Sequence, residues 1–132
     1  MSVETTPVDE VGWQQQWDSA GLFHADIHPD RPKFYCLEMY PYPSGKMHMG
    51  HVRNYSIGDA VARYKRLMGF DVLYPMGFDS FGMPAENAAI SEGGHPHDIT
   101  ERNMASITEQ IKRMGFSYCL LYTSDAADER HC

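Results

Sequence analysis

The sequence predicts an α/β fold, the first half of a doubly wound parallel sheet of the Rossmann type. Three observations lead to this prediction. A short apolar run, residues 34–40, is followed by a turn rich in proline and glycine and by a long amphipathic run, residues 52–68. A second short apolar run, residues 71–74, comes next. Strand, helix and strand in this order are typical of a βαβ unit with parallel strands.

The segment before this unit predicts one helix and a connector. Pro7 could open the helix, Trp13 and Trp17 would lie one turn apart on it, and Gly21 would end it. Residues 24–32 contain two prolines and are expected to connect the helix to the first strand. That strand, residues 34–40, is mostly apolar and aromatic, as expected of a strand buried on both faces.

The helix at residues 52–68 is predicted by its spacing and by its end. Gly69 is well placed to terminate it. Its apolar side chains recur at helical intervals, and they are Ile57, Ala60, Val61, Tyr64 and Leu67.

Two further helices are expected after the second strand. Residues 75–83 would form another turn, and Pro84 could begin a short helix. Asp98 and Glu101 have the spacing of a capping box, which would start a helix that ends at Gly115. The inward face of that helix would consist of Met104, Ile107, Ile111 and Met114.

Size and composition indicate an ordinary globular protein. The chain has 132 residues, of which 42% are hydrophobic and 22% charged, enough for one domain with a core. No apolar run approaches the ~20 residues that cross a bilayer, and the chain does not open like a signal peptide, so a cytoplasmic location without a membrane partner is expected. Three cysteines are too few for a disulfide framework, and Cys36 is expected to be a small buried hydrophobe.

The charge argues against a protein that binds nucleic acid by itself. The net charge is −7, and the only local basic cluster is residues 63–66. Phosphate contacts dominate affinity for nucleic acid, so such a protein should carry a basic face. Three charges in four helical residues usually form a solvated face. If RNA is a partner, its main contacts are expected outside this segment.

The turn between the first strand and the long helix is the candidate functional site. It places His48 and His51 at the start of the helix, where residues three apart share a face and two rings would lie side by side. Gly50 between them would leave the backbone open to a flat ligand. Ligands of α/β sheets bind beyond the carboxyl ends of the strands, which is where this turn would lie.

Three interpretations of the histidine pair are open from the residues alone. They could be ordinary surface or core histidines. They could hold a metal ion, for which His95, His97 and Asp98 are the only nearby additional ligands. They could bind nucleotide phosphates together with the helix N-terminus. A Walker-type loop is excluded, because Met47 stands where its Ser or Thr should be and Tyr40 where its first Gly should be.

The motif at residues 48–51, His-Met-Gly-His, resembles the His-Ile-Gly-His signature of the class I aminoacyl-tRNA synthetases. The surrounding sequence is similar to the bacterial leucyl-tRNA synthetases from about Trp13 to Tyr118. The similarity rests on residues 42–45 (Tyr-Pro-Ser-Gly), 51–55 (His-Val-Arg-Asn-Tyr), 57–59 (Ile-Gly-Asp), 62–66 (Ala-Arg-Tyr-Lys-Arg) and 78–87 (Phe-Asp-Ser-Phe-Gly-Met-Pro-Ala-Glu-Asn). Phe81 favours leucyl over valyl or isoleucyl enzymes, which usually have His there.

The resemblance implies a leucine–tRNA ligase, of which this chain would be the N-terminal catalytic part. Such an enzyme uses ATP as a substrate, with Mg²⁺, to convert leucine to leucyl-adenylate, and then transfers leucine to tRNA(Leu). His48 and His51 would be catalytic and would bind ATP together with Gly50 and Asn54. The leucine would be bound by Met39, Tyr40, Tyr42 and Asp79. No metal site belonging to the protein is implied, and the full-length enzyme would be a monomer.

The similarity breaks off after Tyr118, where the family pattern calls for Asp-Trp. Residues 119–132 show neither helical nor strand periodicity and are expected to be foreign or out-of-frame sequence. The catalytic segment is therefore expected to be residues 1–118. The family's second signature, its editing domain and its anticodon-binding region have no counterpart in these residues, so the chain alone is expected to be inactive. The alternatives are a non-catalytic ATP-binding or interaction module, a metal-binding module, and a valyl or isoleucyl enzyme.

Overall fold

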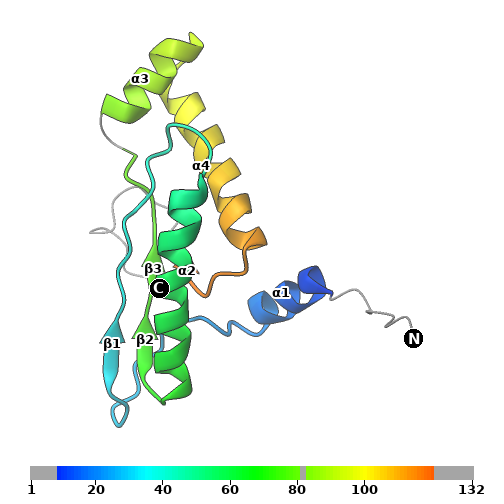
Figure 1. The fold of residues 1–132 in the computed structure, drawn as a ribbon, viewed down its shortest axis with the longest axis vertical. Coiled ribbons are helices and arrows are strands. Elements are labelled where there is room, and N and C mark those ends of the chain that lie inside the picture. Colours follow the sequence, from blue (N-terminus) through cyan, green and yellow to red (C-terminus); the bar gives the residue numbers. More distant parts are fainter. Residues whose placement is uncertain (1–8, 81–82, 121–132) are drawn as a thin grey trace.

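The computed structural model describes residues 9–80 and 83–120, which form helices packed to one side of short parallel strands (Figure 1). The elements in chain order are α1 (Glu10–Ser19), β1 (Lys33–Tyr35), α2 (Met49–Leu67), β2 (Asp71–Leu73), β3 (Pro75–Met76), α3 (Met83–Glu92), α4 (Pro96–Arg113) and β4 (Cys119–Leu120). β1 pairs with β2 and β3 pairs with β4, both in parallel. The predicted α/β class and the parallel βαβ unit β1–α2–β2 are confirmed.

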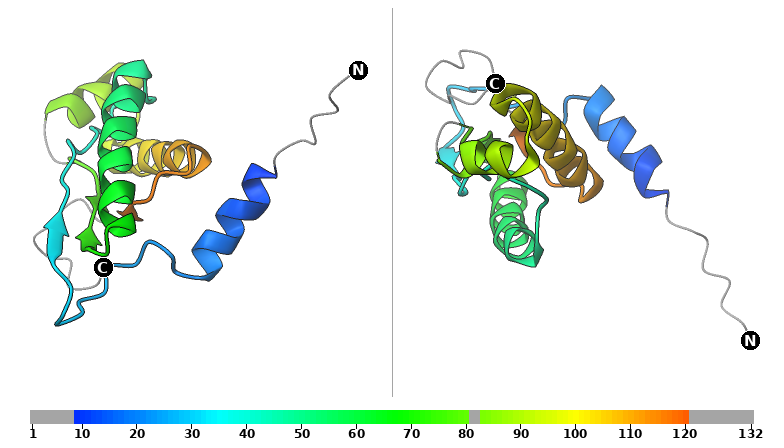
Figure 2. Two further views of the ribbon diagram at one scale, coloured as in Figure 1. Left: turned by 60° about the horizontal axis from the view of Figure 1, so that its bottom comes forward. Right: turned by 90° about the horizontal axis from the view of Figure 1, so that it is seen from above.

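The core lies between α2, the strands and α4. Its fully buried members include Tyr55 from α2, Tyr74 between β2 and β3, and Ile107 from α4. α3 packs against α4, while α1 extends away from the other elements (Figures 1 and 2). The described residues contain no helix that is both long and apolar enough to cross a membrane.

α1 begins at Glu10, because the Asp9 carboxylate caps it by accepting a hydrogen bond of 2.9 Å from the Gly12 amide. Pro7, the expected start, lies outside the described residues. The helix ends as predicted before Gly21, which adopts φ +57°. It is attached to the body by Gln14 Nε2, which donates to the Arg113 carbonyl over 3.2 Å, and by the Trp17 ring, which lies 5.5 Å from the Arg63 guanidinium. As expected, residues 24–32 contain no helix or strand.

The first strand is shorter and less buried than predicted. Only Lys33–Tyr35 form a strand, and the chain beyond it keeps an alternating pattern in which Tyr35, Leu37 and Met39 are exposed. Cys36, predicted to be buried, is only half-buried. The reason is that the described residues cover this strand on one face only, the face toward α2.

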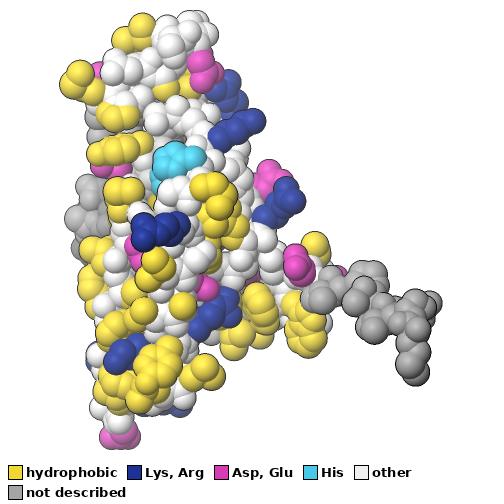
Figure 3. Space-filling model, viewed as in Figure 1, with side chains coloured by type: hydrophobic (Ala, Val, Ile, Leu, Met, Phe, Trp, Pro, Cys, Tyr) yellow, Lys and Arg dark blue, Asp and Glu magenta, His cyan; other side chains and the backbone are white. Residues whose placement is uncertain are grey.

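α2 matches the predicted helix to within a few residues, and Gly69 follows it with φ +84°. The side chains that predicted it nevertheless point away from the core, since Ile57 is 57%, Tyr64 58% and Leu67 88% exposed. The buried face of α2 consists of Tyr55, Gly58, Asp59 and Ala62 instead. A Cβ on Gly58 would lie 1.7 Å from Glu38 Oε1 and 2.6 Å from the Tyr74 hydroxyl, so a larger residue here would displace these side chains. The outer apolar side chains lie in the hydrophobic surface seen over lower α2 (Figure 3).

The predicted capping box of the last long helix is wrong. α4 begins at Pro96, with His95 as a cap that makes no side-chain hydrogen bond, and Asp98 lies inside the first turn. Proline at the first helical position is already set to the helical φ angle, which explains the earlier start. Ile107 and Ile111 are buried as predicted, Met104 is half-buried and Met114 is exposed. The helix ends before Gly115, as expected.

Residues 75–83 are not simply a turn, because Pro75–Met76 form β3. α3 starts at Met83, one residue before Pro84, the expected start. Cys119 donates its amide to the Tyr74 carbonyl over 2.9 Å and begins β4, a strand that the sequence pattern did not predict. Residues 121–132 of the expected atypical tail lie outside the described residues, and the boundary after residue 118 stays a prediction.

The basic cluster on α2 is not a solvated face, contrary to expectation. Arg63 donates to the Asp59 carboxylate over 2.7 Å and to the Gly115 carbonyl over 2.6 Å. Arg66 donates to the side chain and carbonyl of Ser117 over 2.6 and 2.9 Å. The two guanidinium groups therefore fasten the segment after α4 to α2.

Candidate functional site

The two histidines of the predicted site lie together at the N-terminal end of α2. His48 is the extended N-cap residue, and His51 lies in the first turn. The His48 ring accepts a hydrogen bond at Nδ1 from the Gly50 amide over 3.1 Å. The His51 ring accepts one at Nδ1 from the His48 amide over 3.2 Å. The ring centroids are 4.1 Å apart, which confirms the predicted side-by-side arrangement.

Gly50 has a steric role at this helix start. A Cβ on residue 50 would lie 2.8 Å from Cε1 and 2.9 Å from Nδ1 of His48, closer than such contacts occur. The space that the sequence suggested for a ligand is thus partly taken by the His48 ring. Glycine leaves room for the capping imidazole, which folds back over the first turn.

The electrostatics of the N-terminal end of α2 favour binding of an anion. The unpaired amides of a helix N-terminus carry a partial positive charge. Burial and the neighbouring His48 lower the pKa of His51, so its ring is neutral at pH 7 and carries one N–H donor. Histidine side chains form a patch over the upper part of α2 on the face shown in Figure 3.

α4 holds the turn that leads to the histidines. Asn103 Nδ2 donates to the Pro43 carbonyl over 2.9 Å, and the Met47 amide donates to Gln110 Oε1 over 3.3 Å. Pro41 and Pro43 are fully buried. Sequence reasoning missed both polar anchors, although Asn103 falls on the apolar stripe of α4 between buried isoleucines, which is a signal for a buried polar contact.

The structure connects the histidines to the residues predicted to bind an amino acid. The His51 and Tyr55 rings lie 5.8 Å apart, and the Tyr55 hydroxyl donates to the Met39 carbonyl over 3.0 Å. Burial, with a contribution from Glu38, raises the pKa of Tyr55 to about 12, so the hydroxyl keeps its proton. Sequence reasoning missed Tyr55, which lies one turn after His51 on α2.

Asp79 joins the same region through its backbone, since its amide donates to the Pro41 carbonyl over 3.2 Å. Asp79, Met39 and Tyr42 are exposed, which excludes a core role for these side chains in the described part of the chain. Tyr40 is half-buried and packs against the core. Asn54 is exposed on α2. Whether these residues bind leucine or ATP stays a prediction.

The metal interpretation receives no support from side-chain positions. His95 and His97 lie at the start of α4 with ring centroids 6.5 Å apart, and His97 pairs with Asp98. Within residues 9–80 and 83–120, no three or more His, Cys, Asp or Glu side chains are arranged to hold a metal ion.

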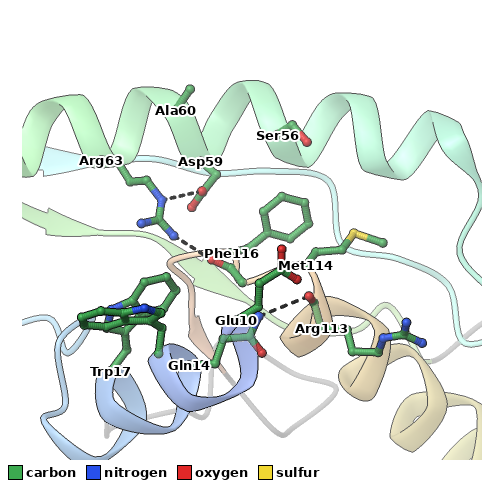
Figure 4. Close-up of a pocket in the computed structure, with 12 residues that line it drawn as sticks. Glu10, Gln14, Trp17, Ser56, Asp59, Ala60, Arg63, Arg113, Met114 and Phe116 are labelled. Atoms are coloured by element: carbon green, nitrogen blue, oxygen red, sulfur yellow. Dashed lines mark hydrogen bonds and ion pairs between the residues drawn. The ribbon is translucent and has the colours of Figure 1, made fainter. Parts of the chain in front are cut away.

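A cleft of about 830 Å³ lies elsewhere, between α1, α2 and the end of α4 (Figure 4). Trp13 and Trp17 from α1 line it opposite Asp59 and Arg63 from α2, together with Phe116. On the α2 wall, Asp59 and Arg63 are bonded to each other, and both are bonded to the segment after α4. The sequence did not predict this cleft, and neither histidine of the candidate site lines it.

Comparison with known proteins gives one family match. The family model described as tRNA synthetases class I (M) matches residues 35–132. Proteins named leucine–tRNA ligase from Nitratidesulfovibrio vulgaris (strain DSM 19637 / Miyazaki F) and Paramagnetospirillum magneticum are each 60% identical over 109 residues. Each match covers 83% of this chain and 13% of the relative, so the chain spans only a small part of the curated relatives it matches.

Solved structures of synthetases share the fold, among them the following two. The LeuRS of Agrobacterium radiobacter K84, in a ternary complex with tRNA and LeuAMS, is 45% identical with a TM-score of 0.83. The match covers 89% of this chain and 16% of that one. The Mycobacterium tuberculosis methionyl-tRNA synthetase in complex with methionyl-adenylate is 28% identical with a TM-score of 0.64, covering 74% and 19%. The similarity to leucyl-tRNA synthetases inferred from the motifs is thereby confirmed.

Proposed function

Because the chain belongs to the class I tRNA synthetase family, we propose that it forms the nucleotide-binding half of the activation site of a leucine–tRNA ligase. The parent enzyme would activate leucine with ATP and transfer it to tRNA(Leu). The observation that carries the proposal is the pair of imidazoles, 4.1 Å apart at the N-terminal end of α2. The identity of 60% to proteins named leucine–tRNA ligase supports the choice of amino acid.

The reaction requires positioning and charge stabilisation rather than a protein nucleophile. The leucine carboxylate attacks the α-phosphorus of ATP, the bond to the β-phosphate oxygen breaks, and pyrophosphate leaves. Negative charge spreads over the phosphate oxygens in the transition state. His48 and His51 would donate hydrogen bonds to those oxygens beside the positive end of α2.

Mg²⁺ would neutralise the triphosphate when bound, and it would arrive with ATP. The described residues offer no cluster of three or more acidic, histidine or cysteine side chains to hold the ion by themselves, so we assign no step of the reaction to it. Asn54 and Gly50 are the remaining residues that we propose lie against ATP.

The leucine-binding part of the site would begin after the first strand, β1. Met39 and Tyr42 are exposed apolar side chains next to the backbone that Tyr55 holds, and Tyr40 lies between them. Asp79 is fastened to Pro41, so its carboxylate could pair with the substrate ammonium. An apolar pocket separates side chains that differ by one methylene by only ~1–3 kcal/mol, so rejection of valine and isoleucine would be limited here.

Contacts with tRNA would lie mainly outside this segment. The net charge is −7, and the arginines of the one basic cluster are bonded to the chain itself. These two arginines are therefore not free to neutralise a phosphate backbone. The cytoplasmic location, expected from the lack of apolar runs, and the monomeric state of the parent enzyme, implied by the resemblance, stay predictions.

The proposal can be tested in a chimera. The leucine–tRNA ligase of Nitratidesulfovibrio vulgaris would carry the 109-residue matching segment of this chain in place of its own. We expect exchange of pyrophosphate into ATP when leucine is supplied, and weaker exchange when isoleucine or valine replaces leucine. A folded chimera that shows no exchange with leucine, or prefers valine or isoleucine, would contradict the proposal.

A further inference from the structure

We propose that the backbone at the start of α2 fixes His48 and His51 as Nε2–H tautomers, so that each ring offers Nε2–H as its only donor. The hydrogen bonds that the two rings donate to the nucleotide would then come from Nε2 of His48 and Nε2 of His51. The part that concerns the nucleotide rests on the proposed function. The tautomers themselves follow from the helix start alone.

The direction of two hydrogen bonds determines the tautomers. The Gly50 amide lies 3.1 Å from His48 Nδ1, and the His48 amide lies 3.2 Å from His51 Nδ1. A backbone amide can only donate, so each Nδ1 must present a lone pair. A neutral imidazole carries one N–H, which is then on Nε2 in both rings.

The arrangement is reciprocal and requires each Nδ1 to be an acceptor. His48 caps the helix with its ring while its own amide is bonded to the His51 ring, as the two ends of a capping box are. A proton on either Nδ1 would turn an acceptor into a donor facing another N–H. Two charged rings with centroids 4.1 Å apart would also repel each other. The lowered pKa of His51 agrees with this.

Gly50 is the positioning residue that keeps the His48 ring hydrogen-bonded to the helix start. The methyl group of an alanine would lie within 3 Å of two atoms of the His48 ring and would push that ring off the Gly50 amide. Gly45 in the same turn provides a matched control, since a Cβ there has no neighbouring atom within 4 Å.

His28 provides a contrast within the same chain. Its Nδ1 lies 2.9 Å from the Asp71 carboxylate, and hydrogen bonds from Lys33 and His28 lower the pKa of that aspartate. An ionised carboxylate only accepts, so His28 must carry a proton on Nδ1. One spectrum should therefore show opposite states at His28 and at the α2 histidines.

The test is nitrogen-15 NMR of the complete 132-residue chain at pH 7.5, with trimethylamine N-oxide added to favour the folded state. Two-bond correlations from the ring protons distinguish a protonated from an unprotonated nitrogen, and His48→Asn and His51→Asn variants assign the signals. We expect an unprotonated Nδ1 and a protonated Nε2 at both residues. Gly50→Ala should return His48 to averaged tautomers, whereas Gly45→Ala should leave the spectrum unchanged.

Averaged tautomers in the unmodified chain, or Nδ1–H at either residue, would overturn the inference. So would an unchanged His48 spectrum in Gly50→Ala. ATP added to the same sample separates the two proposals. A shift of both Nε2 resonances supports ATP binding, whereas fixed tautomers whose Nε2 signals ignore ATP would contradict the proposed function and leave the tautomer assignment standing.

Discussion

Replacing Asp59 by asparagine should destabilise the chain by about 2–4 kcal/mol, because its carboxylate joins α2 to the segment after α4. Asp59 is 9% exposed and accepts three hydrogen bonds, from Arg63 Nε at 2.7 Å, the Ser117 amide at 2.7 Å and the Ser117 hydroxyl at 2.5 Å. An amide keeps one acceptor oxygen and turns its NH₂ group toward another donor. Either the pairing with Arg63 is lost, or the fully buried Ser117 is left unsatisfied.

Urea unfolding followed by circular dichroism measures this loss. A slope of roughly 1–3 kcal/mol/M converts the expected loss into a midpoint lowered by about 0.7 M or more, or into a chain already unfolded without urea. Asp98→Asn is the control, because the Asp98 side chain is 79% exposed and lies 3.3 Å from His97 at the surface. Equal midpoints for the two variants would refute the role given to Asp59.

Three further outcomes follow from the same structure. Burial lowers the pKa of His51, so the His51 ring takes up a proton more readily in the unfolded chain than in the folded one. The free energy of unfolding should therefore fall as the pH drops below ~6.5. Equal urea midpoints at pH 7.5 and 5.5 would contradict this. Ile107→Ala, at a side chain 1% exposed, should cost about 2–5 kcal/mol in thermal or urea unfolding, whereas Ile90→Ala, at one 77% exposed, should change little. The purified 132-residue chain should be marginally stable and should not charge tRNA with leucine. The reason is that its described strands form only two-stranded sheets and that α2 exposes large apolar side chains. Detectable leucyl-tRNA would show this prediction to be wrong.

The elements that sequence reasoning found are those fixed by local signals. The βαβ unit follows from run lengths and from Gly69, and the proximity of His48 and His51 follows from helical spacing. What it missed depends on contacts between distant segments. The exposed face of α2 was not predictable from its apolar residues, because the inward face carries Tyr55 and Asp59, whose partners Met39 and Ser117 lie far away in the sequence.

The same distinction holds at the candidate site. The capping box expected at Asp98 occurs instead at His48, since Pro96 already starts α4, and histidine is an uncommon cap that no pattern search would select. Asn103 anchors the turn across 60 residues of sequence, a separation at which spacing carries no information. Arg63 and Arg66 look like a surface cluster until the segment after α4 is placed against them.

The central claim is that the imidazoles at the start of α2 stabilise charge on the phosphates of ATP. Its most direct test is the rate of leucine-dependent pyrophosphate exchange by the chimera with His51→Ala, measured against the chimera with Gly45→Ala. We expect the histidine variant to lose ~2–4 kcal/mol of transition-state stabilisation, about 30- to 1,000-fold in kcat/KM, as removal of an oxyanion donor does. An exchange rate equal to that of the Gly45→Ala control would contradict the claim.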